Sequence, residues 1–114
     1  MPASAEPDIA QVVETAKRCF YDDHNYLAAA ALLKRLVADR ATSERLTPEV
    51  FLILGESYHQ LATFTREELI DLKSEAIADG VAKEAIDAAW ADRGAWRERA
   101  EEFLKEHALR KAAE

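Results

Sequence analysis

Apolar residues recur at intervals of three and four positions along most of this 114-residue chain. The first such run consists of Ile9, Val12, Val13, Ala16, Cys19 and Phe20. An α-helix turns once in about 3.6 residues, so this spacing places the apolar side chains of a segment on one helical face. Segments of this kind bury their apolar faces by packing helix against helix. The sequence therefore predicts an all-α fold.

Turn and capping signals divide the first half of the chain into three helical segments. The polar residues 22–25 end the first helix, and a second helix is expected to run to about Arg40. The turn between them is short, which predicts an antiparallel hairpin. After a polar connector at residues 41–46, Thr47 is expected to cap the third helix through its hydroxyl, with Pro48 at the first helical position.

Similar signals divide the second half. Thr65 and Glu68 have the spacing of a capping box, and Gly80 can end a helix in a left-handed conformation. We therefore predict a helix over residues 66–79. Apolar residues then continue at helical spacing to near the C-terminus, and Gly94 is expected to break or kink the helix. In total the sequence predicts five or six helices.

Length and charge restrict the domain organisation and the partners. A chain of 114 residues suits a single domain, which we place at residues 8–114, with frayed residues 1–7 before it. The net charge of −7 disfavours nucleic acid and anionic membranes as partners. Without a long apolar run or a signal-peptide pattern, the expectation is a soluble cytoplasmic protein. The single cysteine, Cys19, cannot form an internal disulfide and is expected in the core.

The most specific local pattern is Phe51, Leu54, Gly55 and Tyr58. It resembles the aromatic-x2-Leu-Gly-x2-Tyr spacing in the first helix of a tetratricopeptide repeat. A glycine inside a helix costs about 1 kcal/mol relative to alanine. We therefore expect a neighbouring helix to lie too close to Gly55 for any side chain.

A preceding unit resembles the same repeat at the positions Val13, Phe20, Tyr26, Ala29 and Leu33. Lys17 stands where this unit should have its glycine, and Val13 and Phe51 are 38 positions apart where the family has about 34. The resemblance covers about residues 10–64. It implies that residues 8–64 form antiparallel helix hairpins in a tetratricopeptide-like array, which the C-terminal helices of residues 65–112 cap.

The resemblance also implies a groove between the first helices of the two hairpins. Its partner-binding residues would be Arg18, Tyr21, Leu52, Glu56 and His59. Aromatic and imidazole rings, a leucine and mixed charges suit a peptide or a helix better than a metabolite. We predict a non-enzymatic protein-interaction module, such as an adaptor, chaperone or assembly factor, that needs no cofactor. Self-association is left open.

A helix-turn-helix DNA-binding regulator is the first alternative. Ala76, Gly80, Val81 and Ile86 have the spacing of a small residue, a turn glycine and apolar anchors in such a motif. The recognition helix would cover residues 83–93. Its acidic residues outnumber its basic ones, which opposes binding to a phosphate-lined groove.

A small helical metal-binding protein or enzyme subunit is the second alternative. Glu56 and His59 form a Glu-x-x-His pair, the spacing used in carboxylate-bridged di-iron bundles. Those sites need a second such pair, and the sequence has none. There is also no glycine-rich phosphate loop and no nucleophile in a recognisable motif. We therefore predict neither a metal site nor catalytic residues.

Overall fold

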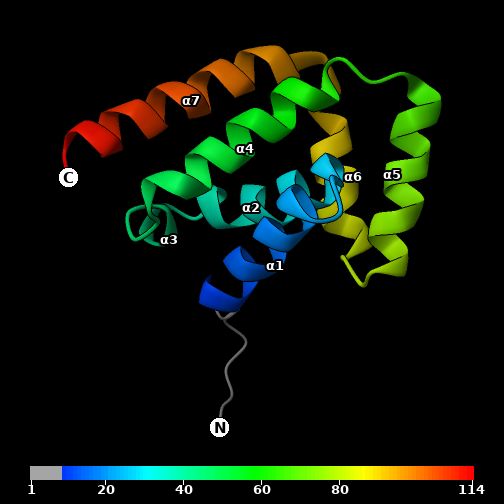
Figure 1. The fold of residues 1–114 in the computed structure, drawn as a ribbon, viewed down its shortest axis with the longest axis horizontal. Coiled ribbons are helices and arrows are strands. Elements are labelled where there is room, and N and C mark those ends of the chain that lie inside the picture. The colour runs from blue at the N-terminus through cyan, green and yellow to red at the C-terminus, as the bar shows by residue number, and fades with distance from the viewer. Residues whose placement is uncertain (1–8) are drawn as a thin grey trace, which may run out of the picture.

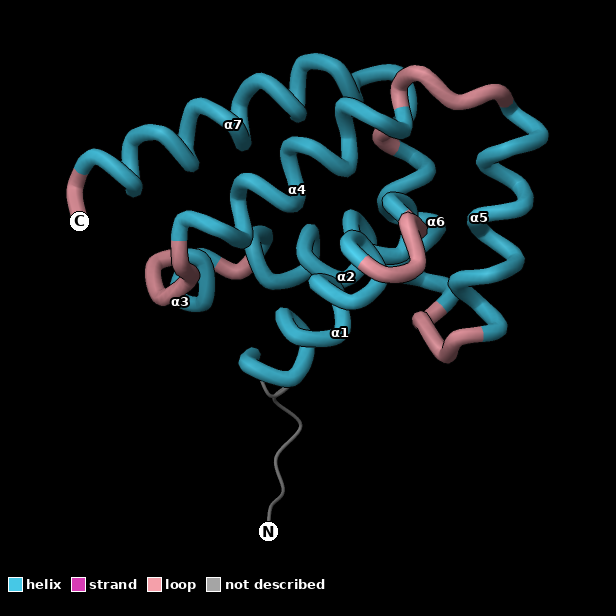
Figure 2. Tube along the Cα trace, viewed as in Figure 1, coloured by secondary structure: helices cyan, strands magenta, loops and turns pink. Residues whose placement is uncertain are grey.

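The computed structural model describes residues 9–114, and all regular structure in that range is helical (Figure 1). The elements are α1 (Ile9–Tyr21), α2 (Tyr26–Ala38), α3 (Arg40–Ser43), α4 (Pro48–Leu61), α5 (Arg66–Ala78), α6 (Lys83–Ala91), the 3₁₀ turn η1 (Arg93–Ala95) and α7 (Trp96–Ala112). Short loops connect them (Figure 2). The predicted all-α class is confirmed. The predicted fraying of residues 1–7 lies outside the described residues.

The predicted count of five or six helices is wrong, because the structure has seven α-helices within residues 9–114. The additional helix, α3, is a single turn inside the segment that the sequence predicts as a connector. The Ser43 amide donates to the Asp39 carbonyl oxygen, and the Glu44 amide donates to that of Arg40. Such a turn has no apolar periodicity of its own, so the pattern on which the prediction rests does not reveal it.

Helix α2 lies at the centre of the molecule. Its residues Leu27, Ala28, Ala29, Ala30 and Ala31 are all fully buried. The helix packs against α1, with which it forms a tight hairpin, and also against α4, α5 and α6. Because alanine side chains are short, several helices can approach this one closely. The core is therefore built around α2.

Helix α7, the longest, folds back along α4 (Figure 1). At the crossing, a Cβ atom added to Gly55 would lie 2.8 Å from Leu104 Cγ and 3.2 Å from the carbonyl oxygen of Ala100. This confirms the prediction of a neighbouring helix too close to Gly55 for a side chain. The helix concerned is α7, whereas α5, the next helix after α4 in sequence, lies against α2 and α6.

The helix ends agree with the sequence in most cases. The capping box is present, because the Glu68 amide donates to Thr65 Oγ1 and the Thr65 amide donates to Glu68 Oε1. Gly80 has a φ of +94°, as a left-handed end requires. The expected hydroxyl cap of Thr47 is wrong: within the described chain its side chain makes no capping bond. The Val50 amide donates instead to the Thr47 carbonyl oxygen.

Candidate functional site

The exposed face of α1 carries the first half of the predicted binding residues. Ala16 and Cys19 are buried against the core, so the opposite side of the helix exposes Arg18 and Tyr21. A depression of about 470 Å³ is lined by this helix and the turn after it, and both residues line it. The Tyr21 ring is half exposed. A large aromatic side chain is thus available to solvent beside a cation.

The Tyr21 ring packs against one end of a series of aromatic rings. Phe20 meets Tyr21 edge to face, with ring centres 4.9 Å apart. Phe20 also contacts Tyr26, which in turn contacts Phe64 at the end of the series. Edge-to-face geometry is the favoured arrangement of aromatic pairs. The series therefore connects an exposed ring on α1 to the loop between α4 and α5.

Helix α4 carries the second half of the predicted set. α2 and α7 cover most of this helix, and its buried residues are Val50, Phe51, Ile53, Leu54, Gly55, Ser57, Tyr58 and Leu61. Leu52 and Glu56 are half-buried and His59 is exposed. These three residues therefore lie on the side of α4 that remains open to solvent.

The first turn of α4 contacts the third turn of α1. Lys17 Nζ of α1 lies 3.0 Å from Glu49 Oε1 of α4, and this hydrogen bond raises the pKa of the lysine above its ordinary value. A cleft of about 620 Å³ lies between the first turns of α1 and residues 45–50. Lys17 is the residue that replaces the expected glycine, and in the structure it connects the two helices.

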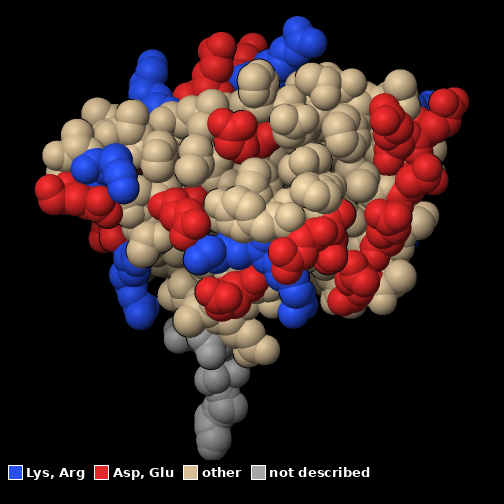
Figure 3. All heavy atoms as spheres, in the orientation of Figure 1, with Lys and Arg blue, Asp and Glu red and all other residues tan. Residues whose placement is uncertain are grey.

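The α1–α4 face, defined as Arg18, Tyr21, Leu52, Glu56 and His59, is thus divided between two helices in contact. Arg18 and Tyr21 line one depression together, whereas the cleft at the helix junction is lined by other residues. In Figure 3, charges of both signs gather over α1, while the surface around α4 carries few charged side chains. The role of the five residues in binding stays a prediction.

The α5–α6 corner contains the residues of the helix-turn-helix alternative. Ala76, Val81 and Ile86 are buried, and Gly80 makes the turn. The exposed residues of α6 include Glu84 and Asp87, and acidic side chains also gather over α5 in Figure 3. Negative charge at this corner opposes contact with phosphates. The alternative stays a prediction that the electrostatics disfavour.

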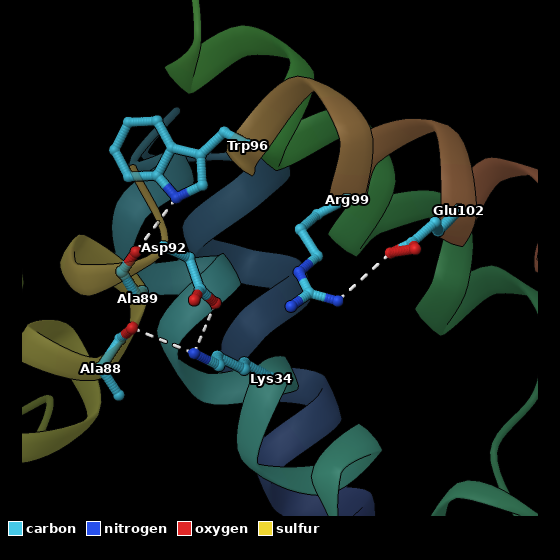
Figure 4. A network of polar contacts seen from close by, with 7 residues as sticks. All are labelled: Lys34, Ala88, Ala89, Asp92, Trp96, Arg99 and Glu102. Carbon is cyan, nitrogen blue, oxygen red and sulfur yellow. Dashed lines mark hydrogen bonds and ion pairs between the residues drawn. The ribbon is translucent and has the colours of Figure 1, made fainter. Parts of the chain in front are cut away.

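A polar network joins α2 to the end of α6 (Figure 4). Lys34 Nζ donates to the carbonyl oxygen of Ala88 and pairs with the carboxylate of Asp92. The Trp96 indole N–H donates to the carbonyl oxygen of Ala89, 3.0 Å away. A cation of α2 and the indole N–H of Trp96 therefore bind carbonyl groups in the last turn of α6, where the Ala89 carbonyl oxygen also accepts from the Asp92 amide.

Tyr58 lines a small cleft of about 210 Å³ beside this network. Its hydroxyl is buried and has no hydrogen-bond partner within residues 9–114. Burial raises the pKa of Tyr58 well above its ordinary value, and the negative charge of Asp92 raises it further. The phenol therefore stays protonated at neutral pH. Across residues 9–114, no three His, Cys, Asp or Glu side chains lie together as metal ligands would.

Cys19 is buried, as the sequence predicts. Burial raises the pKa of its thiol, and the charge of Asp23 raises it further. We expect a thiol-specific reagent at pH 8 to label the folded protein on the order of 100-fold more slowly than the urea-unfolded protein. The labelling rates are measured by absorbance. Equal rates for the folded and the unfolded protein would contradict the buried position of Cys19.

The sequence alone does not reveal a group of arginines that the fold brings together. Arg66, Arg93 and Arg97 line one cleft of about 570 Å³. Arg93 and Arg97 are four positions apart, but Arg66 comes from α5, so local spacing could not reveal the whole group. Arg99, two positions after Arg97, pairs with Glu102 at 3.3 Å.

No helix between residues 9 and 114 has the length and apolar content needed to cross a membrane. No protein-family model, curated protein or solved structure matches the chain significantly.

Proposed function

We propose that this chain is a non-enzymatic interaction module that binds a peptide or helix of a partner protein on the α1–α4 face. The observation that carries the proposal is the half-exposed ring of Tyr21 beside Arg18 in the depression on α1. Tyrosine and arginine dominate the binding energy of many protein interfaces. Because Phe20 already holds the ring in place, a partner would lose little side-chain entropy in binding it.

The arrangement of α1, α2 and α4 also supports a tetratricopeptide-like array as the scaffold. α1 and α2 form an antiparallel hairpin, and α4 packs against both of them. In Figure 1, α1 and α4 rise in about the same direction, as the first helices of successive repeats do. In this proposal α7 covers the side of α4 that a further helix of the array would occupy.

The test is affinity capture from native cell extract with an Arg18→Glu, Tyr21→Ala double variant beside the wild type. We expect the wild type to retain a defined protein, and the double variant to bind that protein about 100-fold more weakly in a titration. The melting temperature should stay within about 2 °C of wild type, because both side chains are exposed.

The matched control is Arg35→Glu with Leu109→Ala, which changes an exposed cation and an exposed apolar side chain on α2 and α7. This variant should retain the same protein as the wild type. If the Arg18, Tyr21 variant binds it equally well, the α1–α4 face is the wrong surface. If only further copies of the chain are retained, sedimentation velocity should show a self-associating protein and the adaptor proposal fails.

A further inference from the structure

The end of α4, the loop into α5 and the start of α7 meet at the top of the molecule (Figure 1). The cleft of about 570 Å³ between them has three buried apolar side chains at its base: Leu61, Leu69 and Trp96. Phe64, which is half-buried, also lines it. This volume lies within the range of about 300–1,000 Å³ that is usual for small-molecule sites.

Three arginines surround the cleft, although the protein as a whole has a net charge of −7. Among residues 9–114, neither Arg66 nor Arg97 forms an ion pair or a side-chain hydrogen bond. Arg93 lies over the ring of Trp90, 5.4 Å from its centre. The cleft therefore contains cations that the carboxylates of residues 9–114 leave unpaired.

Two of these arginines stand where a helix by itself disfavours a cation. Arg66 is the first residue of α5 and Arg97 is the second residue of α7. The partial positive charge of a helix N-terminus repels cations and attracts anions. Of the nearby carboxylates, that of Glu68 is engaged in the capping box, that of Glu67 follows Arg66 in the first turn of α5, and only Glu98 lines the cleft. With three positive charges against one negative, the lining has a formal charge of +2.

We propose that this cleft binds a small molecule with a phosphate group and an apolar body. A phosphate dianion matches the formal charge of the lining, and the planar guanidinium groups donate paired hydrogen bonds to its oxygens. The amides of Arg66 and Glu67 offer further donors, because the capping box engages only that of Glu68 in the first turn of α5. The apolar body would lie over Phe64 and Leu69. This site is separate from the α1–α4 face.

Isothermal titration calorimetry at low ionic strength tests the proposal, with phenyl phosphate, inorganic phosphate and benzyl alcohol as probes. We expect saturable binding of phenyl phosphate, weaker binding of inorganic phosphate and none of benzyl alcohol. Arg66→Gln and Arg97→Gln should each weaken phenyl phosphate about tenfold, the usual effect of losing a charged hydrogen bond. Arg97→Lys should weaken it less, because the charge remains.

Arg35→Gln is the matched control, because Arg35 is an exposed arginine on α2 outside the cleft. It should bind phenyl phosphate as the wild type does, and so should the Arg18→Glu, Tyr21→Ala variant. Absence of saturable binding to the wild type, or equal weakening by Arg35→Gln, would overturn the proposal. Equal affinity for inorganic phosphate and phenyl phosphate would show that the cleft does not bind the apolar body of the ligand. Circular dichroism must show every variant folded.

Discussion

Replacing Gly55 with alanine is expected to lower the free energy of unfolding by about 2 kcal/mol. In an ordinary helix the same change would raise it by about 1 kcal/mol, since alanine has the higher helix propensity. Here the new Cβ atom would lie 2.8 Å from Leu104 Cγ and 3.2 Å from the Ala100 carbonyl oxygen. The first contact is with a branched carbon and the second with backbone, so relief requires α7 to shift. Overpacking of this kind costs about 1–3 kcal/mol.

Urea denaturation followed by circular dichroism measures the effect, with Gly94→Ala as the matched control. No atom lies within 4 Å of a Cβ added to Gly94, so that change should leave stability unchanged or raise it slightly. In a Leu104→Ala background, Gly55→Ala should cost clearly less than in the wild type, because the closest contact is removed. A stabilising effect of Gly55→Ala alone would show that α7 does not pack against this glycine.

Gly55 also shows how far the fold could be predicted from sequence. A glycine inside a strongly apolar helix has a propensity cost, so the sequence indicates a close neighbour at that position. It does not indicate which helix provides it. The contact is made by Ala100 and Leu104, more than forty positions later. Which helix lies against Gly55 depends on how all the helices pack in the core around α2.

The same distinction applies to the candidate sites. The exposure of Arg18 and Tyr21 follows from helical period, because α1 buries Ala16 and Cys19 on its other side. The arginine cleft could not be predicted in this way. Its three arginines belong to three elements, and their proximity depends on the path of the chain from α4 through α5 and α6 to α7. The spacing of apolar residues thus predicts which side chains of one helix are exposed. It does not predict which residues of different helices lie close together.

Replacing Asn25 with alanine is expected to lower the free energy of unfolding by about 3 kcal/mol. Asn25 is almost fully buried in the turn between α1 and α2. Its Oδ1 accepts a hydrogen bond from the Ala28 amide, which caps α2, and its Nδ2 donates to the Leu72 carbonyl oxygen of α5. Losing the cap to the Ala28 amide costs about 1 kcal/mol, and losing the buried bond to the Leu72 carbonyl oxygen adds about 1–3 kcal/mol.

Asn25→Asp separates the two bonds, because a carboxylate keeps the acceptor for Ala28 and loses the donor to Leu72. It places an oxygen against the Leu72 carbonyl oxygen, so native-state hydrogen exchange should quicken more in α5 than in α2. Thr65→Ala, which removes an exposed cap, should cost only about 1 kcal/mol and serves as the control. If Asn25→Ala cost no more than Thr65→Ala, the bond to Leu72 would contribute little, and α5 would be held against α2 by its apolar contacts alone.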